Sequence, residues 1–490
     1  MGNSFSKGGR WEIEQDPTLC TKADKQKDKT MDSSYLLAEN IVDTRYEDLP
    51  LEVIEVTKKR ILDTTGVILA ASTLGENSVK EIVELVKEDG GKEESTIIGF
   101  GGKVVSWMAA FANGAMAHQL DYDDCYDIGV VHPGAATVPA ALAIAERQGS
   151  VTGKEFITAI ALGSDVVCRL SYPLTKDTFE YAWARTGTLG KFGATASAGK
   201  LLGLDTTQMV SAFGLVLHQA TISLEATYTP ESDVRAIRDG FVAKAGVFSA
   251  VLANKGIIGD KNSLDGKYGL YNACWLGDSD PARVTAEIGK KFAGVDVSFK
   301  PWPCCRNLHG FIEATLHLVK EHDIKSEDIV EITAVSGGMR KSYYEELDKR
   351  RMPKTSIDAR FSLPFVLGVA VARRNVMLED FTLEGRSNPA ALEVAQRVKY
   401  RFDERYKRPG IEIGLVEITV KSGQKYSKEV IFAYGHPENP ISKEDLAAKF
   451  RDCASHSVTS LPRDRVDKII ETLNRLEEVT DMGQVIQLLA

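Results

Sequence analysis

Residues 118–140 carry the densest group of side chains that could move a proton. Four carboxylates fall within seven residues, and a histidine follows them before a Pro-Gly pair: Asp121, Asp123, Asp124, Asp127 and His132. Acidic side chains are normally exposed, yet Ala-rich apolar stretches flank this segment on both sides. Carboxylates and an imidazole at the edge of an apolar core are suited to acid–base catalysis. The alternative is that the acids cap and solvate a loop between two helices.

A second stretch, 300–310, gathers cations, thiols and a histidine where a strand is expected to lead into a helix. Its reactive members are Lys300, Cys304, Cys305, Arg306 and His309. Backbone N–H groups at a helix start favour anions and lower the pKa of a thiol, which predicts an activated Cys305. Adjacent cysteines do not easily place both sulfurs on one zinc ion, so we expect no metal site. The alternative is that both thiols are buried as small apolar side chains.

Two arginines open a predicted helix further along the chain. Arg235 and Arg238 lie about one turn apart, and side chains at that spacing share a helix face. From one face they can grip a carboxylate with paired hydrogen bonds. Tyr228 lies just upstream and is a candidate for lining the same pocket. A solvent-exposed helix face fits the same spacing.

Composition excludes several classes of function. The 490 residues carry a formal net charge of −9 and a pI near 5.6, which argues against a nucleic-acid surface. Seven scattered cysteines indicate a reducing compartment rather than a disulfide framework. No apolar run is long enough to span a membrane, and no signal-peptide core opens the chain, so we expect a cytoplasmic protein. Gly2 matches an N-myristoylation pattern, and Met31 is an alternative start.

Helical periodicity dominates the first half of the chain and returns at its end. The predicted helices of the first half span about 51–71, 79–86, 105–120, 135–147, 153–170, 187–203, 206–218 and 240–255. Glycines inside these helices predict close packing of helix on helix.

Strand-like stretches appear after residue 260. They are Val295–Phe299, Ile329–Val335, Leu415–Val420 and Glu429–Ala433, with the last two forming a hairpin around Gly423 and with helices at about 307–321 and 361–373. We therefore predict a mainly α fold with a large all-helical domain and a smaller α+β lid domain. The predicted boundaries are a disordered tail at 1–33, the helical domain at 34–293 and 440–490, and the lid domain at 294–439.

Five motifs in a fixed order make the chain resemble the MmgE/PrpD family of enzymes. They are Leu120–Asp124 with His132-Pro-Gly, Thr186-Gly-Thr-Leu-Gly-Lys-Phe-Gly, Gly240-Phe-Val-Ala-Lys-Ala-Gly, Lys300-Pro-Trp-Pro-Cys-Cys-Arg with His309, and Asp358-Ala-Arg-Phe-Ser-Leu-Pro. The resemblance covers about residues 35–485. It implies a helical domain built from both chain ends, a lid, a site between them and a homodimer. It also implies a small di- or tricarboxylic acid as substrate and no required cofactor.

Carried over by position, the resemblance makes Asp121 and His132 the catalytic pair, and Lys300 and His309 the lysine and histidine of the lid. Four positions depart from the family pattern. Ala184 replaces a histidine, Arg235 a lysine, Cys305 a lid histidine and Phe361 the tyrosine of the decarboxylases. These departures argue against cis-aconitate decarboxylation.

The resemblance implies chemistry that begins on carbon next to a carboxylate. The residues expected to hold substrate carboxylates are Arg235, Arg238, Lys300 and Arg306. His132, oriented by Asp121, is the expected base, and Cys305 or His309 would act on the opposite face. We predict a lyase of the dehydratase type. An epimerase with two opposed bases and an inactive ligand-binding homologue are the alternatives.

Overall fold

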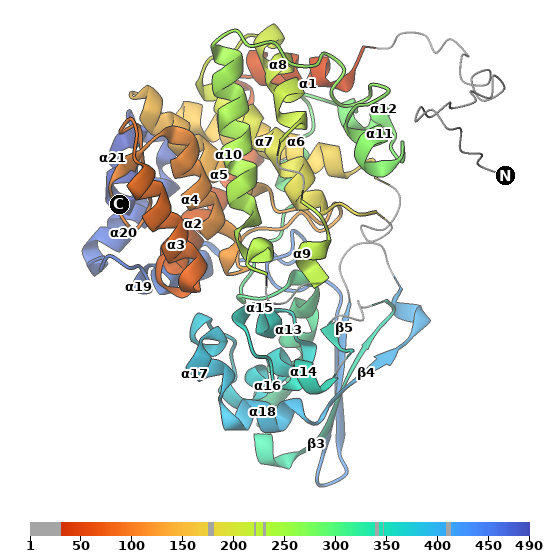
Figure 1. Ribbon diagram of the computed structural model, residues 1–490. Coiled ribbons are helices and arrows are strands. Elements are labelled where there is room, and N and C mark those ends of the chain that lie inside the picture. Colours follow the sequence, from red (N-terminus) through yellow and green to blue (C-terminus); the bar gives the residue numbers. More distant parts are fainter. Residues whose placement is uncertain are drawn as a thin grey trace, which may run out of the picture.

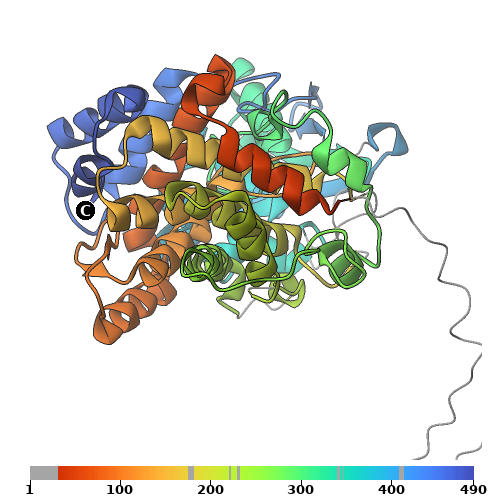
Figure 2. The ribbon, with the colours of Figure 1, turned by 90° about the horizontal axis from the view of Figure 1, so that it is seen from above.

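The structure, a computed structural model, describes residues 31–174, 181–219, 222–228, 232–338, 343–345, 347–407 and 413–490. Figure 1 shows a large helical part above a smaller part that combines helices with a sheet. Figure 2 shows the helical part from above. The predicted fold class, mainly α with a smaller α+β part, is confirmed. The predicted tail lies outside the described residues as far as residue 30, and Ser33 already begins a helix.

Helices from both ends of the chain build the larger part. They are α1 (Ser33–Asp43), α2 (Leu51–Leu74), α3 (Glu76–Asp89), α4 (Ser106–Gln119), α5 (Pro133–Gln148), α6 (Gly153–Ser171), α7 (Arg185–Leu201), α8 (Thr206–Leu217), α9 (Glu225–Tyr228), α10 (Val234–Asn254), α11 (Leu270–Trp275), α12 (Pro281–Thr285), α19 (Lys443–Ser455), α20 (Arg463–Asn474) and α21 (Met482–Leu489). A short hairpin of β1 (Ser95–Thr96) and β2 (Lys103–Val104) joins α3 to α4. Of the C-terminal helices, α19 and α20 pack against α2, and α21 packs against α5 and α20 (Figure 1).

Glycine allows α4 and α10 to approach closely. A Cβ atom at Gly114 in α4 would lie 2.8 Å from the backbone oxygen of Asp239 in α10. One at Gly240 would lie 2.6 Å from the backbone oxygen of Phe111. Neither distance leaves room for a side chain, so these two glycines hold together the helices that carry the histidine and the arginines of the site. The predicted close packing of helices at glycine positions is confirmed where α4 crosses α10.

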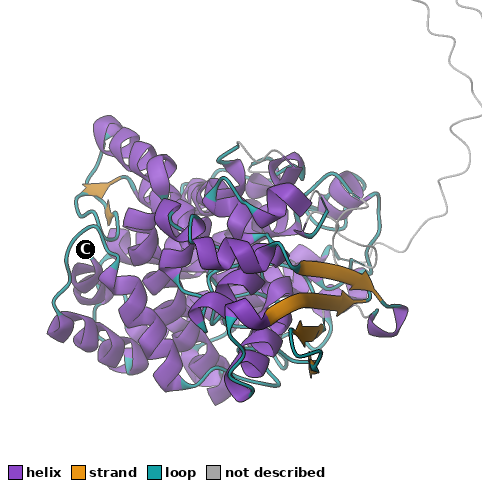
Figure 3. Cartoon of the chain, turned by 90° about the horizontal axis from the view of Figure 1, so that it is seen from below, coloured by secondary structure: helices purple, strands orange, loops and turns teal. Residues whose placement is uncertain are grey.

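The smaller part contains the main sheet. Its elements are α13 (His309–Glu321), β3 (Ile329–Ser336), α14 (Leu347–Arg351), α15 (Ser356–Arg360), α16 (Leu363–Arg373), α17 (Leu383–Arg386), α18 (Pro389–Ala395), β4 (Val398–Phe402), β5 (Gly414–Val420) and β6 (Lys425–Val430). The strand order is β4-β3-β5-β6, with β3 parallel to β4 and the other pairs antiparallel. Helix α13 packs on β5 and β6, and Figure 3 shows the strands at one side of the molecule.

Short 3-10 turns connect several elements. They are η2 (Tyr46–Asp48), η4 (Ala293–Val295), η5 (Arg306–Leu308), η6 (Ser326–Asp328), η8 (Leu378–Phe381), η9 (Glu404–Tyr406) and η10 (Leu476–Glu478). One of them replaces a predicted strand. Instead of a strand at Val295–Phe299, η4 is followed by a single bridge between Ser298 and Cys125. Ser298 thus bonds to the loop between α4 and α5, and its segment does not join the main sheet.

Two separate sets of buried apolar side chains fill the molecule. One draws on residues 37–299 and 441–489, together with Leu378. The other draws on residues 302–433. We call the parts of the chain around these two cores the body and the lid. The predicted domain boundaries agree with them in outline and stay a proposal. No described helix is long and apolar enough to cross a membrane.

Candidate active site

The loop between α4 and α5 is buried. Its four acids are between 0% and 6% exposed: Asp121, Asp123, Asp124 and Asp127. Their burial contradicts the alternative that they solvate the loop, but Asp124 does cap a helix, because its Oδ1 accepts from the backbone N–H of Gly134 in the first turn of α5 at 2.8 Å. Asp121 and Val130 have φ angles of +48° and +54°, a conformation that a residue other than glycine keeps only where its surroundings hold it. The loop ends at His132, which precedes Pro133 at the first position of α5.

Two of the four acids anchor the loop. Asp124 accepts a hydrogen bond from Nε of Arg60 in α2, at 2.7 Å. Asp127 accepts one from the hydroxyl of Ser298 at 2.5 Å and lies 3.4 Å from Nε of Arg306. Both carboxylates are paired, so their role is to hold the loop to α2 and to the start of the lid.

Asp123 joins two histidines from the two ends of the loop. His118 Nδ1 lies 2.9 Å from Asp123 Oδ1, and His132 Nδ1 lies 3.2 Å from Asp123 Oδ2. His132 Nδ1 also lies 2.8 Å from the backbone oxygen of Asp124, which can only accept. The proton of neutral His132 is therefore on Nδ1, and Nε2 presents a bare lone pair. The sequence predicted Asp121 as the residue that orients His132, but the carboxylate bonded to its ring is Asp123.

His118 is held neutral from its other side. Its Nε2 lies 2.5 Å from Nη1 of Arg235 and 2.9 Å from Nη2 of Arg238. Because a guanidinium only donates, Nε2 must accept, and Nδ1 carries the proton that is given to Asp123. Burial and Arg238 lower the pKa of His118 to about 4, against the opposing effect of Asp123. Burial raises the pKa of Asp123, but the histidines outweigh it and leave that pKa well below its ordinary value.

Asp121 is paired with the lysine of the lid. Lys300 Nζ lies 2.6 Å from Asp121 Oδ1 and 2.7 Å from the backbone oxygen of the same residue. Burial disfavours both charges, but mutual attraction sets the pKa of Asp121 far below and that of Lys300 above the ordinary value. Both side chains are therefore charged. The other oxygen of Asp121, Oδ2, is buried and has no hydrogen-bond donor among the described residues.

A lysine of the C-terminal helices holds this pair from behind. Lys449 Nζ in α19 donates to the backbone oxygen of Tyr122 at 2.6 Å and to that of Lys300 at 2.9 Å. It also forms a buried ion pair of 2.6 Å with Asp63 of α2. With one ammonium group, Lys449 thus fixes the backbone of Tyr122, which follows Asp121, and the backbone of Lys300, which pairs with Asp121.

Cys305 faces the site as a neutral thiol. Its Sγ lies 3.3 Å from the hydroxyl oxygen of Tyr343. Burial, and then the charge of Asp121, raise the pKa of the thiol. The prediction that a helix start activates Cys305 is therefore wrong. Only the 3-10 turn η5 follows it, and burial beside an anion outweighs the N–H groups of that turn.

Two predicted site residues, His309 and Arg306, are engaged outside this cluster. His309 has Nε2 at 3.2 Å from the backbone oxygen of Cys304 and packs edge-on against Trp302. Arg306 is engaged with the loop acid described above and with two lid carbonyls. Tyr228 ends α9, and its side chain lies outside the described residues.

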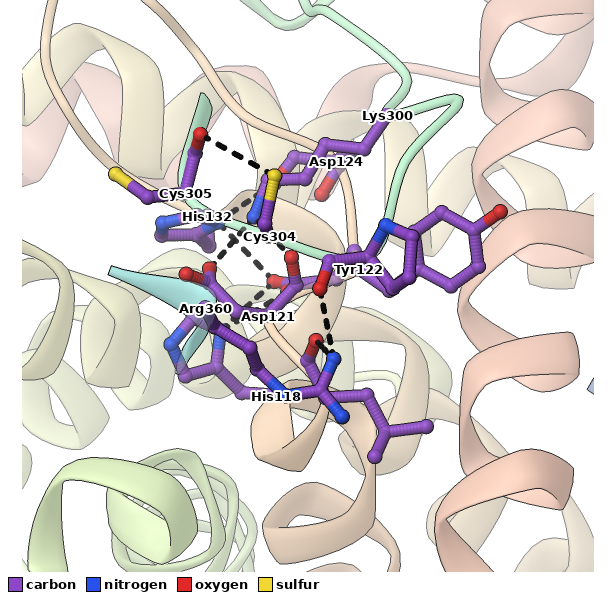
Figure 4. A network of polar contacts seen from close by, with 12 residues as sticks. His118, Asp121, Tyr122, Asp124, His132, Lys300, Cys304, Cys305 and Arg360 are labelled. Atoms are coloured by element: carbon purple, nitrogen blue, oxygen red, sulfur yellow. Dashed lines mark hydrogen bonds and ion pairs between the residues drawn. The ribbon is translucent and has the colours of Figure 1, made fainter. Parts of the chain in front are cut away.

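The cluster combines a base, a neutral acid and fixed cations. Figure 4 shows its side chains converging from α4, the loop and the lid. Arg235 of α10 completes it and lies over the ring of Phe361 at 4.9 Å. A bare imidazole nitrogen can take a proton, a neutral thiol can give one, and lysine and arginine can stabilise a developing negative charge.

The spacing of three side chains in this cluster would suit a metal ion, but their protonation and their charged neighbours would not. His118, Asp123 and His132 offer ligand atoms within 4.8 Å of one another. Each histidine, however, turns a protonated Nδ1 toward the carboxylate, and two guanidinium groups touch His118. Neighbouring positive charges oppose a cation at this place.

Two domain families match the chain in order. The MmgE/PrpD N-terminal domain matches residues 36–282, and the MmgE/PrpD C-terminal domain matches residues 302–475. The chain belongs to the MmgE/PrpD family. The family resemblance predicted from the five motifs is thereby confirmed.

Relatives of this MmgE/PrpD chain match it over nearly its whole length. Cis-aconitate decarboxylase of Mus musculus is 25% identical over 455 residues, 89% of this chain and 89% of the relative. Cis-aconitate decarboxylase of Aspergillus terreus is 24% identical over 463 residues, 90% of this chain and 93% of the relative. Cis-aconitate decarboxylase-like protein oryM of Aspergillus oryzae is 22% identical over 470 residues, 92% and 95%. Decarboxylases are lyases, and this MmgE/PrpD chain is an enzyme of that type.

Sequence reasoning missed three residues that build the site of this family member, His118, Tyr343 and Lys449, and it named Asp123 without assigning it to a histidine. His118 and Asp123 carried a signal, because a histidine that ends an apolar helix is buried and needs a partner, and an acid follows five residues later. Tyr343 and Lys449 carried none. Each reaches the site from a distant part of the chain, at a position that reads as an ordinary lid or helix residue.

Proposed function

We propose that this MmgE/PrpD enzyme is a lyase of the dehydratase type that acts on a small di- or tricarboxylic acid without a cofactor. The observation that carries the proposal is His132, whose proton is fixed on Nδ1 and whose ring lies 4.7 Å from that of His118, the residue that contacts Arg235 and Arg238. Abstraction of a proton next to a carboxylate needs a neutral base and positive charge for the resulting enolate.

The first step removes the proton from carbon. A substrate carboxylate lies against Lys300 and Arg235, and His132 Nε2 takes the proton from the neighbouring carbon. The extra charge spreads into the carboxylate, where the two cations stabilise it. Asp121 keeps Lys300 charged and in place, since the pair is buried and ionised.

The second step expels hydroxide as water. Cys305 gives the thiol proton to the leaving oxygen, and the imidazolium of His132 later returns a proton to the thiolate through solvent or product. The raised pKa of Cys305 supports this role, because the thiol stays protonated at neutral pH. It disfavours the epimerase alternative, since an epimerase must use the same group as a base in the reverse direction.

Decarboxylation, the activity that the relatives' names give, is weakened for this chain by its own residues. Cys305 and Phe361 stand where the resemblance expects a histidine and a tyrosine, and Ala184 stands where it expects another histidine. Fewer proton donors therefore face the site than in the pattern of the decarboxylases.

Proton NMR in deuterated buffer tests the proposal with a panel of 2- and 3-hydroxy di- and tricarboxylates. Exchange of a C–H proton with formation of an alkene is the expected result. Exchange with inversion and no alkene would establish an epimerase, and release of CO₂ a decarboxylase. No exchange with any acid, from folded protein, would remove the catalytic proposal.

A paired variant assigns the base. His132→Gln should lower the exchange rate by about 10²–10⁴-fold, whereas Asp127→Asn changes an acid of the same loop that contacts no histidine and should retain most of the rate. Equal loss in both variants would mean that the loop has been disturbed and would remove His132 from the role of base.

Two expectations from the sequence stay proposals. The homodimer is tested by light scattering on the purified chain, and a monomer at micromolar concentration would overturn it. The cytoplasmic location is tested by fractionation of the producing cell.

A further inference from the structure

A cavity of about 620 Å³ lies between body and lid, away from the cluster described above. It is lined from the body by the end of α2 and the start of α3, and from the lid by Arg360, η8 and the segment up to Arg386. Its volume lies within the range of small-molecule sites. None of the groups assigned above to proton transfer or substrate binding lines it.

Two buried arginines in the wall of this cavity have unused N–H groups. Arg360 is 1% exposed, and its Nη1 and Nε are engaged, whereas no described residue accepts a hydrogen bond from Nη2. Arg386 is 9% exposed, with Nη1 on the backbone oxygen of Phe381 and Nη2 on that of Lys354. Its Nε is buried and has no acceptor in the described part of the chain. A buried donor such as Nε of Arg386 is costly unless it is satisfied.

The start of α3 adds further donors to the same wall. Helix α3 spans 14 residues, and its cap, Gly75, has no side chain to accept from the first turn. Asn77 and Ser78 of that turn line the cavity. Free N–H groups and the positive end of the helix dipole favour an anion.

Carboxylates and apolar side chains complete the lining. Glu76 and Asp233 line the cavity and are exposed, and Glu76 lies 3.8 Å from Arg386. Leu383, which is 75% exposed, supplies an apolar surface, whereas Phe381 is buried with its ring under the guanidinium of Arg360. The buried side of the cavity thus carries two guanidinium groups, while its two carboxylates are exposed to solvent.

We propose that this cavity binds a small organic anion, a phosphate or carboxylate whose charged group meets Arg360, Arg386 and the start of α3 and whose apolar part lies on Leu383. The same guanidinium that offers Nη2 to the cavity donates Nη1 to the backbone oxygens of Leu120 and Pro303, each at 2.7 Å. Those carbonyls directly precede Asp121 and Cys304. Binding in the cavity is therefore coupled to the catalytic loop, and the ligand acts as an effector.

Hydrogen–deuterium exchange with inorganic phosphate, and separately with succinate, locates the binding. At constant ionic strength, we expect slowed exchange in residues 74–80 and 378–387. Slowing by phosphate but not succinate identifies a phosphorylated ligand, and the reverse a carboxylic acid. Slowing confined to 118–132 and 300–309 would mean that the probes bind only at the catalytic loop, and it would overturn the proposal, as would no change at 50 mM.

Calorimetry on matched variants tests the contacts. Arg386→Gln should weaken binding about tenfold or more, because a charge-assisted hydrogen bond is lost. Ser78→Asp should weaken it by repulsion while leaving the fold intact, since an acid suits the first turn of a helix. Glu76→Gln should tighten binding, because a competing anion is removed. Unchanged affinity in Ser78→Asp and Glu76→Gln would overturn the proposal even if Arg386→Gln does not fold. The result is independent of which reaction the catalytic site performs.

Discussion

One carboxylate, Asp123, lies against the Nδ1 atoms of both histidines at the site. His118 gives its Nδ1 proton to Asp123, and His132 gives its own to the backbone oxygen of Asp124 with Asp123 Oδ2 at 3.2 Å, so each is left with a bare Nε2. The two rings then face different neighbours. His118 Nε2 is blocked by the guanidinium groups of Arg235 and Arg238, whereas no described residue donates a hydrogen bond to His132 Nε2. The same tautomer therefore leaves His118 bonded on both sides and leaves His132 with the lone pair that the proposed base requires.

Asp123→Asn tests this division. An amide offers one acceptor oxygen and one NH₂ group, so it cannot accept from both rings. We expect the C–H exchange rate to fall by about 10²–10⁴-fold, the range for loss of general-base catalysis. Substrate affinity, which the proposed function assigns to Lys300 and Arg235, should change much less. NMR exchange rates over a range of substrate concentrations separate the two effects. A loss of affinity at unchanged maximal rate would contradict the assignment.

The pH dependence of stability tests His118. Its pKa is about 4 in the folded protein and about 6.5 when unfolded. Between these values the unfolded chain binds more protons, so the stability that neutral His118 contributes is present above pH 6.5 and is lost as the pH falls toward 4. The loss is on the order of 3 kcal/mol. Urea titrations of the native protein and of His118→Gln at pH 4.5 and pH 7 should differ by this amount. Asp63, whose pKa is raised to about 6, titrates in the same pH range. Because Asp63 is present in both proteins, its contribution to the free energy of unfolding cancels when the two are compared.

At the scale of elements, the sequence predicted best where a cap and a periodic apolar face agree. Helix α6 begins after Thr152, which forms a capping box with Glu155, and the predicted range of 153–170 is one residue short of Gly153–Ser171. Strand β4 was not predicted, because most of Val398–Phe402 is exposed and its pairing partner, β3, is distant in the sequence. The candidate site could likewise be predicted only as far as local sequence patterns describe it. The motif residues could be named, but which carboxylate meets which histidine depends on a strained loop that no local pattern describes.

Lys449 shows how an element far from the motifs controls the site. In Lys449→Met, Asp63 is left buried without a partner, which should cost about 3–5 kcal/mol of stability. Adding Asp63→Asn removes the charge and should restore part of that stability. The backbone oxygens of Tyr122 and Lys300 stay without their donor, so the C–H exchange rate should remain about tenfold or more below that of the native enzyme. Full recovery of the rate in the double variant would show that Lys449 serves stability alone. The measurements are urea denaturation and NMR exchange on the same samples.

At the scale of the whole molecule, the two ends of the chain meet in one core. Residues 441–489 contribute apolar side chains to the body core, and the lid lies between these residues and the rest of the body in the sequence. The order body, lid, body means that both crossings between the parts lie close to the site. Lys300 follows the first crossing and Lys449 the second, and a hydrogen bond joins them.

Phe450→Ala measures this dependence against a matched control. Phe450 of α19 is 1% exposed and lies against Gly66 of α2, whereas Phe432 of the lid is 46% exposed. Loss of a buried phenylalanine ring should cost about 3–5 kcal/mol, and Phe432→Ala should stay within about 0.5 kcal/mol of the native protein. Urea denaturation followed by circular dichroism should show the whole helical transition moving to lower urea in Phe450→Ala. If the C-terminal helices folded as a unit of their own, only a minor part of the helical signal would move, and the shared core would be refuted.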